Sequence, residues 1–308
     1  MSTFSLILPS LNPTSTPPAA VNETMSSTPS DLKGLRRRLD EIDDKLQDLL
    51  IDRAEIVSMV AASKKHGNLP AFQPAREAEI IRRLVGRHHG ALPIATLVRM
   101  WREMLAATVR LQSHFGVAVF TPPEQQGFWD LARDHYGSNT PMLAYPVTAR
   151  VIRAVTDGLT SVGVLPTPRQ GDTSPWWPYL LSNDENGPRV IARLPFGAAG
   201  NARTGGAEAL AIGFGEQQGS GLDRTLLAVE CAAEVDGVRI AEALSSLGLA
   251  STLCASHRCE GNAVSLVEVE GFVPISDQRL ERLRAEMGSV LRRLLPFGGY
   301  AVPLTVKA

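Results

Sequence analysis

The sequence predicts an α+β chain of several domains: a three-helix module over residues 31–116, a small α/β segment over 117–221 and a C-terminal βαββαβ domain over 222–308. Three observations lead to this prediction. Apolar residues recur at intervals of three and four in the first module, short apolar runs replace that pattern from Gly116, and strand-like and helix-like stretches alternate in the tail. Residues 1–30 are rich in Ser, Thr and Pro, which is typical of a disordered leader.

The composition narrows the classes of function. A formal net charge of -1 argues against a nucleic-acid-binding or membrane-surface protein, because such partners usually require a basic excess. No run of about 18 apolar residues occurs, so we expect no membrane span. Cys231, Cys254 and Cys259 lack the spacing of metal ligands, and we expect reduced thiols, no metal and a cytoplasmic location.

The first module is predicted to contain a long, a short and a second long helix. The first runs from Asp31 to Lys65 on an apolar stripe of Leu32, Leu35, Leu39, Ile42, Leu46, Leu49, Ile56 and Val60. About 35 residues at 1.5 Å rise span roughly 50 Å, so this helix needs a partner along its length. The second helix starts at Pro74 and reaches the region of Gly90. The third begins after Pro93, with the stripe Leu97, Trp101, Met104, Leu111 and Phe115.

The later elements are predicted to be short. VAVF, SVGVLP and RVIARLPF predict strands, and FWDLARDHYG predicts a helix. Residues 197–221, rich in Gly, Ala and Gln, are predicted to form a linker that contains only the short run ALAIGF. In the tail, TLLAVE, STLCASHR, AVSLVEVEGF and GYAVPL predict strands, while GVRIAEALSSLG and SDQRLERLRAEMGSVLRRL predict helices. That βαββαβ order is the ferredoxin-like pattern.

A charge interrupts the apolar stripe of the first helix. Counting by three and four from Leu49 reaches Arg53, so a guanidinium points towards the core, where an unpaired charge is strongly unfavourable. Lys64 projects within about 20° of Arg53, roughly 16 Å away along the helix axis. Arg36 lies about 25 Å from Arg53 along that axis, so it can reach the same small ligand only from a second protomer.

Two further helices add polar side chains to the predicted site. Arg76 and Glu77 fall in the first turn of the second helix, where the helix dipole favours an anion. Thr108 and Gln112, four residues apart on the third helix, face the same side. The whole set is rich in hydrogen-bond donors. Each charge taken singly also fits a solvated helix face or a surface salt bridge, so spacing alone leaves both interpretations open.

The stretches LRRRLDEIDDKLQDLLIDRAEIV, KKHGNLPAFQPAREAEIIRRL and VRMWREMLAATVRLQ resemble the class II, all-helical chorismate mutases in order and spacing. The resemblance covers the whole first module and implies an intertwined homodimer. It implies that Arg36 crosses from the second protomer and that Arg53 and Arg76 bind substrate carboxylates. It further implies that Glu77 accepts the substrate hydroxyl and that Thr108 lies near the ring carboxylate.

The implied reaction is the rearrangement of chorismate to prephenate, which needs no cofactor, no proton transfer and no covalent step. By the resemblance, Lys64 and Gln112 donate to the ether oxygen, whose negative charge grows as its C–O bond lengthens. The pocket holds the substrate in a reactive chair, which removes part of the entropic barrier. Gln73 is a substrate-binding candidate that stands where many members have Asp, three residues before Arg76. Because an amide offers the hydroxyl no charge, weaker substrate binding is expected.

The remaining chain resembles parts of prephenate dehydratases. The tail follows the element order of an ACT-type regulatory domain, with ASHR where that family has a Glu-Ser-Arg-Pro motif. Gly237, Ser256 and Arg258 are therefore candidates for binding a phenylalanine-type effector, and a dimerising domain without ligand fits equally well. The middle resembles a first dehydratase lobe, but the Thr-Arg-Phe signature is missing. About 27 residues separate Phe196 from the tail, too few for a second lobe.

Three functions therefore compete. The first is a chorismate mutase with a regulatory or scaffolding remainder, the second is a bifunctional mutase and dehydratase, and the third is a non-catalytic sensor whose helices only dimerise. Arg53 disfavours the third, because a dimerisation helix is better served by leucine at a seam position. We expect a chorismate mutase that acts on a small molecule and has no nucleic-acid or membrane partner.

Overall fold

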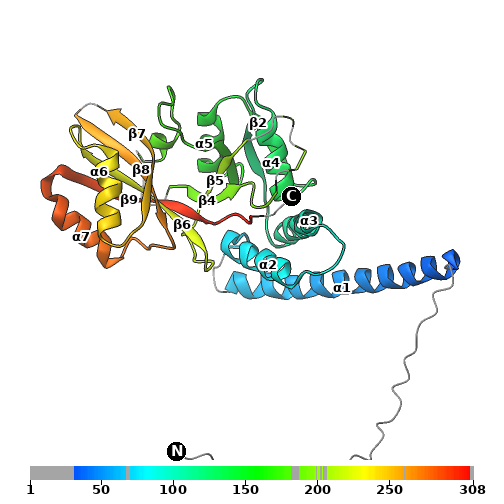
Figure 1. Ribbon diagram of the computed structural model, residues 1–308. Helices are drawn as coiled ribbons and strands as arrows, with labels where there is room; N and C mark the ends of the chain where they lie inside the picture. Colours follow the sequence, from blue (N-terminus) through cyan, green and yellow to red (C-terminus); the bar gives the residue numbers. More distant parts are fainter. Residues whose placement is uncertain are drawn as a thin grey trace, which may run out of the picture. The chain divides into compact units, whose positions relative to one another are not determined.

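The computed structural model describes residues 31–66, 70–181, 187–198, 200–201, 203, 207–259 and 261–305. A helical N-terminal region is followed by a mixed α/β region built on a sheet (Figure 1). The chain divides into two compact units, Met1–Arg53 and Ala54–Ala308, and each is described by itself. The predicted leader, residues 1–30, lies outside the described residues.

Helix α1 spans Leu32–His66, the range that its apolar stripe predicts to within one residue. The eight side chains of that stripe are between 43% and 63% exposed: Leu32, Leu35, Leu39, Ile42, Leu46, Leu49, Ile56 and Val60. The apolar face of a helix normally packs against another element, so a single chain leaves this stripe in water. Neither α1 nor any other helix in the described ranges is long and apolar enough to cross a membrane.

Helices α2 (Pro74–Arg87) and α3 (Ile94–Gln112) start at or beside the prolines that predict them. Pro74 lies in the first turn of α2, where its missing N–H removes no helical hydrogen bond. The two helices share a small core with Phe196, a residue of the α/β region: Ala78, Ile81, Val98 and Leu105. Helices α2 and α3 are therefore packed directly onto a later part of the chain.

The α/β region of the described chain contains a nine-stranded sheet in the order β2-β1-β3-β5-β4-β9-β6-β8-β7. Its strands are β1 Val117–Phe120, β2 Met142–Tyr145, β3 Val162–Pro166, β4 Arg189–Leu194, β5 Ala209–Gly213, β6 Asp223–Ala232, β7 Ser251–Cys259, β8 Asn262–Glu270 and β9 Leu291–Ala301. The helices are α4 Gly127–Tyr136, α5 Thr148–Thr156, α6 Gly237–Ser246 and α7 Gln278–Met287, with short 3-10 turns at Trp177–Leu180 and Gly288–Val290.

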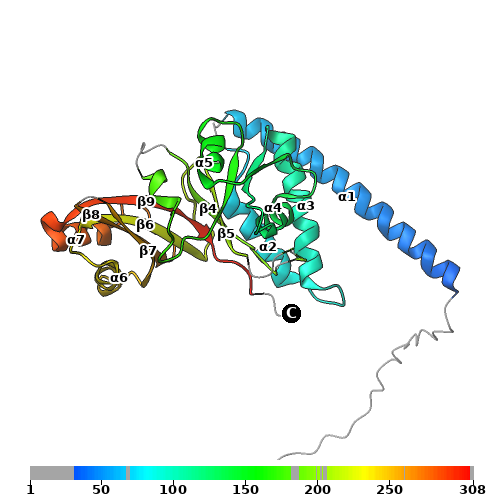
Figure 2. The same cartoon turned by 90° about the horizontal axis from the view of Figure 1, so that it is seen from above.

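Helices α4 and α5 cover opposite faces of the first part of the sheet (Figure 2). Within β1, Val117 and Val119 belong to the core under α4, whereas Ala118 belongs to the core under α5. Because alternate residues of a strand point to opposite faces, the two helices must lie on the two sides. The middle segment is therefore a three-layered α/β structure.

The structure differs from the sequence prediction at residues 209–213. The run ALAIG, predicted to lie in a linker, is strand β5, which is buried along its whole length between β3 and β4. The glycine-rich and polar residues on either side of this run are typical of a linker. A short apolar run becomes a strand only when neighbouring strands pair with it, and the sequence does not show that pairing. The prediction also omits β2 and α5, which are only four and nine residues long.

The tail has the element order β6, α6, β7, β8, α7, β9 that the sequence predicts, and its strands pair antiparallel in the order β9-β6-β8-β7. It is not a separate sheet, because β9 also pairs in parallel with β4, where Val190 opposes Gly298. Gly298 has a φ of 99°, and an added Cβ would lie 2.1 Å from the Val190 carbonyl oxygen. Glycine is therefore required where the tail joins the middle segment.

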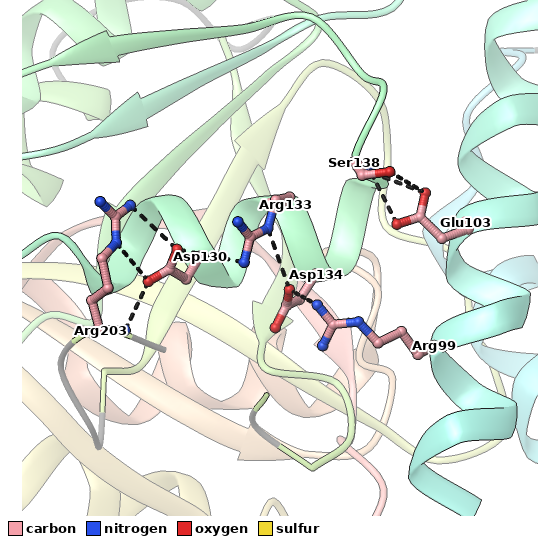
Figure 3. Close-up of polar contacts among 7 residues, drawn as sticks. All are labelled: Arg99, Glu103, Asp130, Arg133, Asp134, Ser138 and Arg203. Carbon is pink, nitrogen blue, oxygen red and sulfur yellow. Dashed lines mark hydrogen bonds and ion pairs between the residues drawn. The ribbon is translucent and has the colours of Figure 1, made fainter. Parts of the chain in front are cut away.

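Polar contacts fix helix α3 to α4 and to the residues that directly follow α4 (Figure 3). Arg99 forms an ion pair with Asp134. The Glu103 carboxylate accepts hydrogen bonds from the backbone N–H and the hydroxyl of Ser138, at 2.9 and 3.1 Å. Since α3 also carries two of the predicted site residues, these contacts anchor part of the candidate site to the α/β region.

Candidate active site

Two of the predicted site residues, Arg36 and Arg53, lie in the unit Met1–Arg53 on α1. The Arg36 side chain is exposed and that of Arg53 is partly buried. They are 17 positions apart on one continuous helix, which corresponds to about 25 Å along its axis. As the sequence indicates, one small ligand cannot contact both arginines of the same helix.

Glu77 is one of the deeply buried predicted site residues in the second unit, at 9% exposed. Its Oε2 forms an ion pair at 3.0 Å with a guanidinium nitrogen of Arg102, and the two side chains are 11% and 5% exposed. Burial raises the pKa of the Glu77 carboxyl above its ordinary value, while the charges of Arg102 and Lys64 oppose that rise. Cations from two other helices thus favour the ionised form of this buried carboxyl.

Lys64 approaches Glu77 from the C-terminal end of α1. Its ammonium donates a hydrogen bond to the carbonyl oxygen of Ala71 at 3.1 Å. Burial lowers the pKa of Lys64, and the nearby Glu77 charge works against that decrease. The structure therefore brings together Lys64 and Glu77, two residues that the sequence assigns to the same site.

Thr108 and Gln112 lie on α3, and both side chains are bound to their own helix. The Thr108 hydroxyl donates to the carbonyl oxygen of Leu105 at 2.8 Å, and the Gln112 amide nitrogen donates to the Thr108 carbonyl oxygen at 3.0 Å. The Gln112 amide oxygen is buried without a hydrogen-bond partner among the described residues. The Gln112 amide nitrogen has two N–H groups, and one of them remains for donation to a ligand.

Gln73 and Arg76 stand apart from this cluster. Arg76 is 62% exposed and forms an ion pair at 2.8 Å with Glu79, one turn further along α2. Gln73 precedes α2 without capping it and lines a cavity of about 290 Å³ whose wall also includes Tyr300 of β9. The structure therefore does not place these two side chains beside Lys64 and Glu77.

Sequence reasoning missed Arg102, because it placed the apolar stripe of α3 one residue away from the face that is buried. That face contains Val98, Arg102, Leu105 and Val109, whereas Leu111 of the predicted stripe is 63% exposed. The spacing of four, three and four between these positions is helical, and it could have identified Arg102 as an inward-facing charge.

Two residues of α4 also reach this cluster and were not predicted. Tyr136, 2% exposed, packs edge-on against Phe72, and its hydroxyl has no hydrogen-bond partner among the described residues. Burial and the Glu77 charge raise the pKa of Tyr136, so its hydroxyl remains protonated. Burial and the Arg102 charge lower the pKa of His135 well below its ordinary value, so its ring is neutral.

The candidate regulatory residues lie in the tail. Gly237, in the first turn of α6, faces Ser256 of β7 so closely that an added Cβ would be 2.7 Å from the Ser256 hydroxyl oxygen. The Ser256 backbone N–H donates to the side-chain oxygen of Gln170 at 2.8 Å. Arg258 is exposed on the same strand. The structure thus brings Gly237 and Ser256 together and leaves the Arg258 side chain at the surface.

The helical region is similar to known proteins. Residues 35–113 match the family model described as chorismate mutase type II. The chain is 32% identical over 143 residues to a bifunctional chorismate mutase/prephenate dehydratase of Pseudomonas aeruginosa, covering 44% of this chain and 38% of that protein. It is 32% identical over 96 residues to a protein of the same description from Aquifex aeolicus, covering 30% of this chain and 26% of that protein.

A solved structure of a prephenate dehydratase from Streptococcus mutans covers 61% of this chain and 98% of that chain, with 14% identity and a TM-score of 0.43. The chain spans less than two fifths of the length of the curated relatives that it matches. The match to residues 35–113 confirms the resemblance between the helical module and the helical chorismate mutases.

Proposed function

We propose that this chain, in which residues 35–113 form a chorismate mutase type II domain, converts chorismate to prephenate. The family match carries the proposal. The convergence of Lys64 and Glu77 supports it, because the two residues come from different helices and are the pair expected to contact opposite parts of the substrate. The rearrangement requires only that the substrate is held in position and that its developing charge is stabilised, and a cluster of Lys64 and Glu77 can supply both.

Each residue has a defined part in the proposed reaction. Glu77 accepts a hydrogen bond from the substrate hydroxyl and so sets the orientation of the ring. Lys64 donates to the ether oxygen and stabilises the negative charge that grows there as the C–O bond breaks. Gln112 joins Lys64 as a second donor to the ether oxygen, through the N–H that the Thr108 carbonyl does not use. Arg76 leaves its exposed pair with Glu79 to bind a substrate carboxylate.

We also propose that the active protein is a homodimer. The uncovered apolar stripe of α1 supports this proposal, because eight exposed apolar side chains on one face of a helix gain free energy by packing on a second copy. A second copy of α1 can also deliver Arg36, which lies too far from Arg53 to serve the same small ligand within one chain. The substrate would then be bound by residues of both protomers.

For the remaining chain we propose the domain limits 1–30, 31–116, 117–221 and 222–308, with the last as a ferredoxin-like, ACT-type domain. The βαββαβ order and the close approach of Gly237 to Ser256 support this assignment. Whether that domain binds a phenylalanine-type effector or only dimerises is decided by assaying the mutase with and without phenylalanine and tyrosine. We propose that the protein is located in the cytoplasm.

The proposal is tested by following chorismate consumption spectrophotometrically with the purified full chain. We expect decay well above the uncatalysed rate, and we expect Lys64→Ala to lower kcat by a factor of about 100 or more, since one lost donor to the developing charge costs about 3–4 kcal/mol. Lys33→Ala, which removes an exposed lysine at the other end of α1, is the matched control and should retain activity. Decay no faster than background would instead identify a non-catalytic sensor.

A bifunctional mutase and dehydratase is the second candidate, because the curated relatives carry that description. The absence of a Thr-Arg-Phe signature from the sequence argues against it. Purified protein given prephenate distinguishes the two candidates. Formation of phenylpyruvate supports the bifunctional enzyme, and stable prephenate supports a mutase alone.

A further inference from the structure

Arg102 is enclosed by parts of the chain that lie beyond the matched family region, residues 35–113. Its guanidinium carbon lies 4.7 Å from the ring centre of Phe196, and its charge lowers the pKa of His135 on α4. The side chain is 5% exposed, and its Nε has no hydrogen-bond partner among the described residues. A guanidinium stacked on an aromatic face and excluded from water is held in one orientation.

The orientation of Arg102 determines that of Glu77. The 3.0 Å ion pair uses the Oε2 of Glu77, and no other described residue forms a hydrogen bond with that carboxylate. The second carboxylate oxygen is therefore left to accept a hydrogen bond from a ligand. Because the pair is buried, each partner depends on the other for its charge, and an unpaired member would be strongly destabilised.

We propose that Arg102 is a positioning residue of the mutase site, which keeps the Glu77 carboxylate ionised and aimed at the substrate hydroxyl, and that the middle segment completes this arrangement by enclosing Arg102. This inference rests on the proposed function. It gives the α/β segment a role in the rearrangement without assigning it any reaction of its own. Arg102 acts through Glu77 and does not touch the reacting atoms.

The titratable groups that face this pair come from two other helices, α1 and α4. Lys64 of α1 faces Glu77 and supports its ionised form, but burial lowers the pKa of Lys64 itself. Tyr136 and His135 of α4 face the pair and are both uncharged, because burial raises the pKa of Tyr136 and lowers that of His135. If Arg102 is neutralised, burial is opposed by Lys64 alone, and the pKa of Glu77 rises.

The predicted consequence is a change in pH dependence. A protonated Glu77 cannot accept the hydroxyl hydrogen bond through the same oxygen, so Arg102→Gln should raise KM more than it lowers kcat, since Lys64 and Gln112 still act on the ether oxygen. At mildly acidic pH we expect kcat/KM to fall by about tenfold or more, which corresponds to one lost hydrogen bond to a charged group. The loss should shrink as the pH rises through the new pKa of Glu77.

The experiment measures kcat and KM for chorismate from mildly acidic to alkaline pH in the full chain. The variants are Arg102→Gln, Arg102→Lys, Glu77→Gln and the double variant of Glu77→Gln with Arg102→Gln. Arg99→Gln is the matched control, because it removes a half-exposed arginine of the same helix that pairs with Asp134 instead. Arg102→Lys should recover part of the lost activity, and Arg99→Gln should leave the pH profile unchanged.

The double variant separates positioning from a merely structural role. Once Glu77 cannot titrate, Arg102→Gln should no longer change the shape of the pH profile. The double variant also leaves no unpaired buried carboxylate, so it can fold even if Arg102→Gln alone does not. In that case Arg102→Lys, which keeps the charge but not the planar guanidinium, is tested for a loss of kcat/KM that is absent in the Glu77→Gln background. An unchanged pH profile in a folded Arg102 variant, or the same shift in the Glu77→Gln background, overturns the positioning role. Chorismate decay by the wild type that does not exceed background overturns the proposed function as well.

Discussion

Gly237 illustrates how a single absent side chain permits close packing. It begins α6 directly against β7 and β8, where an added Cβ would lie 2.6 Å from the Ser265 hydroxyl oxygen and 2.7 Å from that of Ser256. Real Cβ atoms do not approach other atoms so closely, so a larger residue must displace the helix. The sequence alone marks Gly237 as a ligand-binding candidate, and the structure shows that it also has a packing role.

We predict that Gly237→Ala lowers the free energy of unfolding by about 1–3 kcal/mol through overpacking. Gly86→Ala is the matched control, because Gly86 lies inside α2 with no atom within 4 Å of the added Cβ. That substitution should leave stability unchanged or raise it by up to about 1 kcal/mol, since alanine favours helix. Denaturant unfolding measures both, and equal effects would contradict the packing argument.

At the scale of elements, α4 links α3 to the loop that carries Arg203 (Figure 3). The Asp130 side chain on α4 is 3% exposed and accepts hydrogen bonds from the Arg203 backbone N–H at 2.8 Å and its Nε at 3.1 Å. Burial raises the pKa of this carboxyl, but those hydrogen bonds and the charges of Arg203 and Arg133 outweigh burial and hold the pKa below its ordinary value. The ionised carboxylate therefore stabilises the fold.

We predict that Asp130→Asn lowers the free energy of unfolding at neutral pH by about 1–3 kcal/mol. A carboxyl whose pKa is lower in the folded than in the unfolded state stabilises the fold above the unfolded pKa, and that contribution is lost as the pH falls through the folded value. The difference between variant and wild type should therefore disappear in acid. Thermal unfolding against pH measures it.

Asp157→Asn provides the comparison for that experiment. Asp157 pairs with Arg153 at 3.2 Å, but both side chains are largely exposed, at 61% and 72%. Exposed pairs contribute about 1 kcal/mol or less, so the control should change little at any pH. A difference between Asp130→Asn and wild type that persists unchanged at acidic pH would show that the Asp130 charge is not its cause.

At the scale of the whole molecule, the apolar stripe of α1 is a surface that a single chain leaves exposed to water. The eight stripe residues are each at least 43% exposed, although the apolar face of a helix normally packs against another element. In the proposed homodimer, burying the stripe on a second copy would supply both the missing core and the second Arg36. Dimerisation and mutase activity should therefore be lost together.

We predict that replacing Leu39 and Leu46 together by Glu yields a monomer whose chorismate turnover is near background, because two charges in the seam oppose the packing of two copies. Asp44→Ala is the control, since Asp44 points about 180° away from the stripe and should leave both properties intact. Light scattering reports the mass, and the chorismate assay reports activity. A monomer with full activity would contradict the shared site.

Much of the fold could be predicted from sequence because its signals are local. The limits of α1, α2 and α3 follow from apolar spacing and from the prolines at Pro74 and Pro93, and the tail elements follow from alternating runs. Strand β5 was not predictable, because its five residues form a buried strand only through pairing with β3 and β4. The same holds for the candidate site. The sequence predicted which types of residue it contains, but it did not predict which residues pair with them.

The sequence by itself determined the helical module, its resemblance to the chorismate mutase type II family and the residues expected to bind substrate, because helix periodicity and motif spacing depend on neighbours along the chain. Only the tertiary structure decided that Glu77 pairs with Arg102, that Phe196 and α4 enclose that pair, and that β9 continues the sheet beside β4. These contacts join residues far apart in the chain. Their free energies depend on burial and on the partner's charge, and neither is encoded in local spacing.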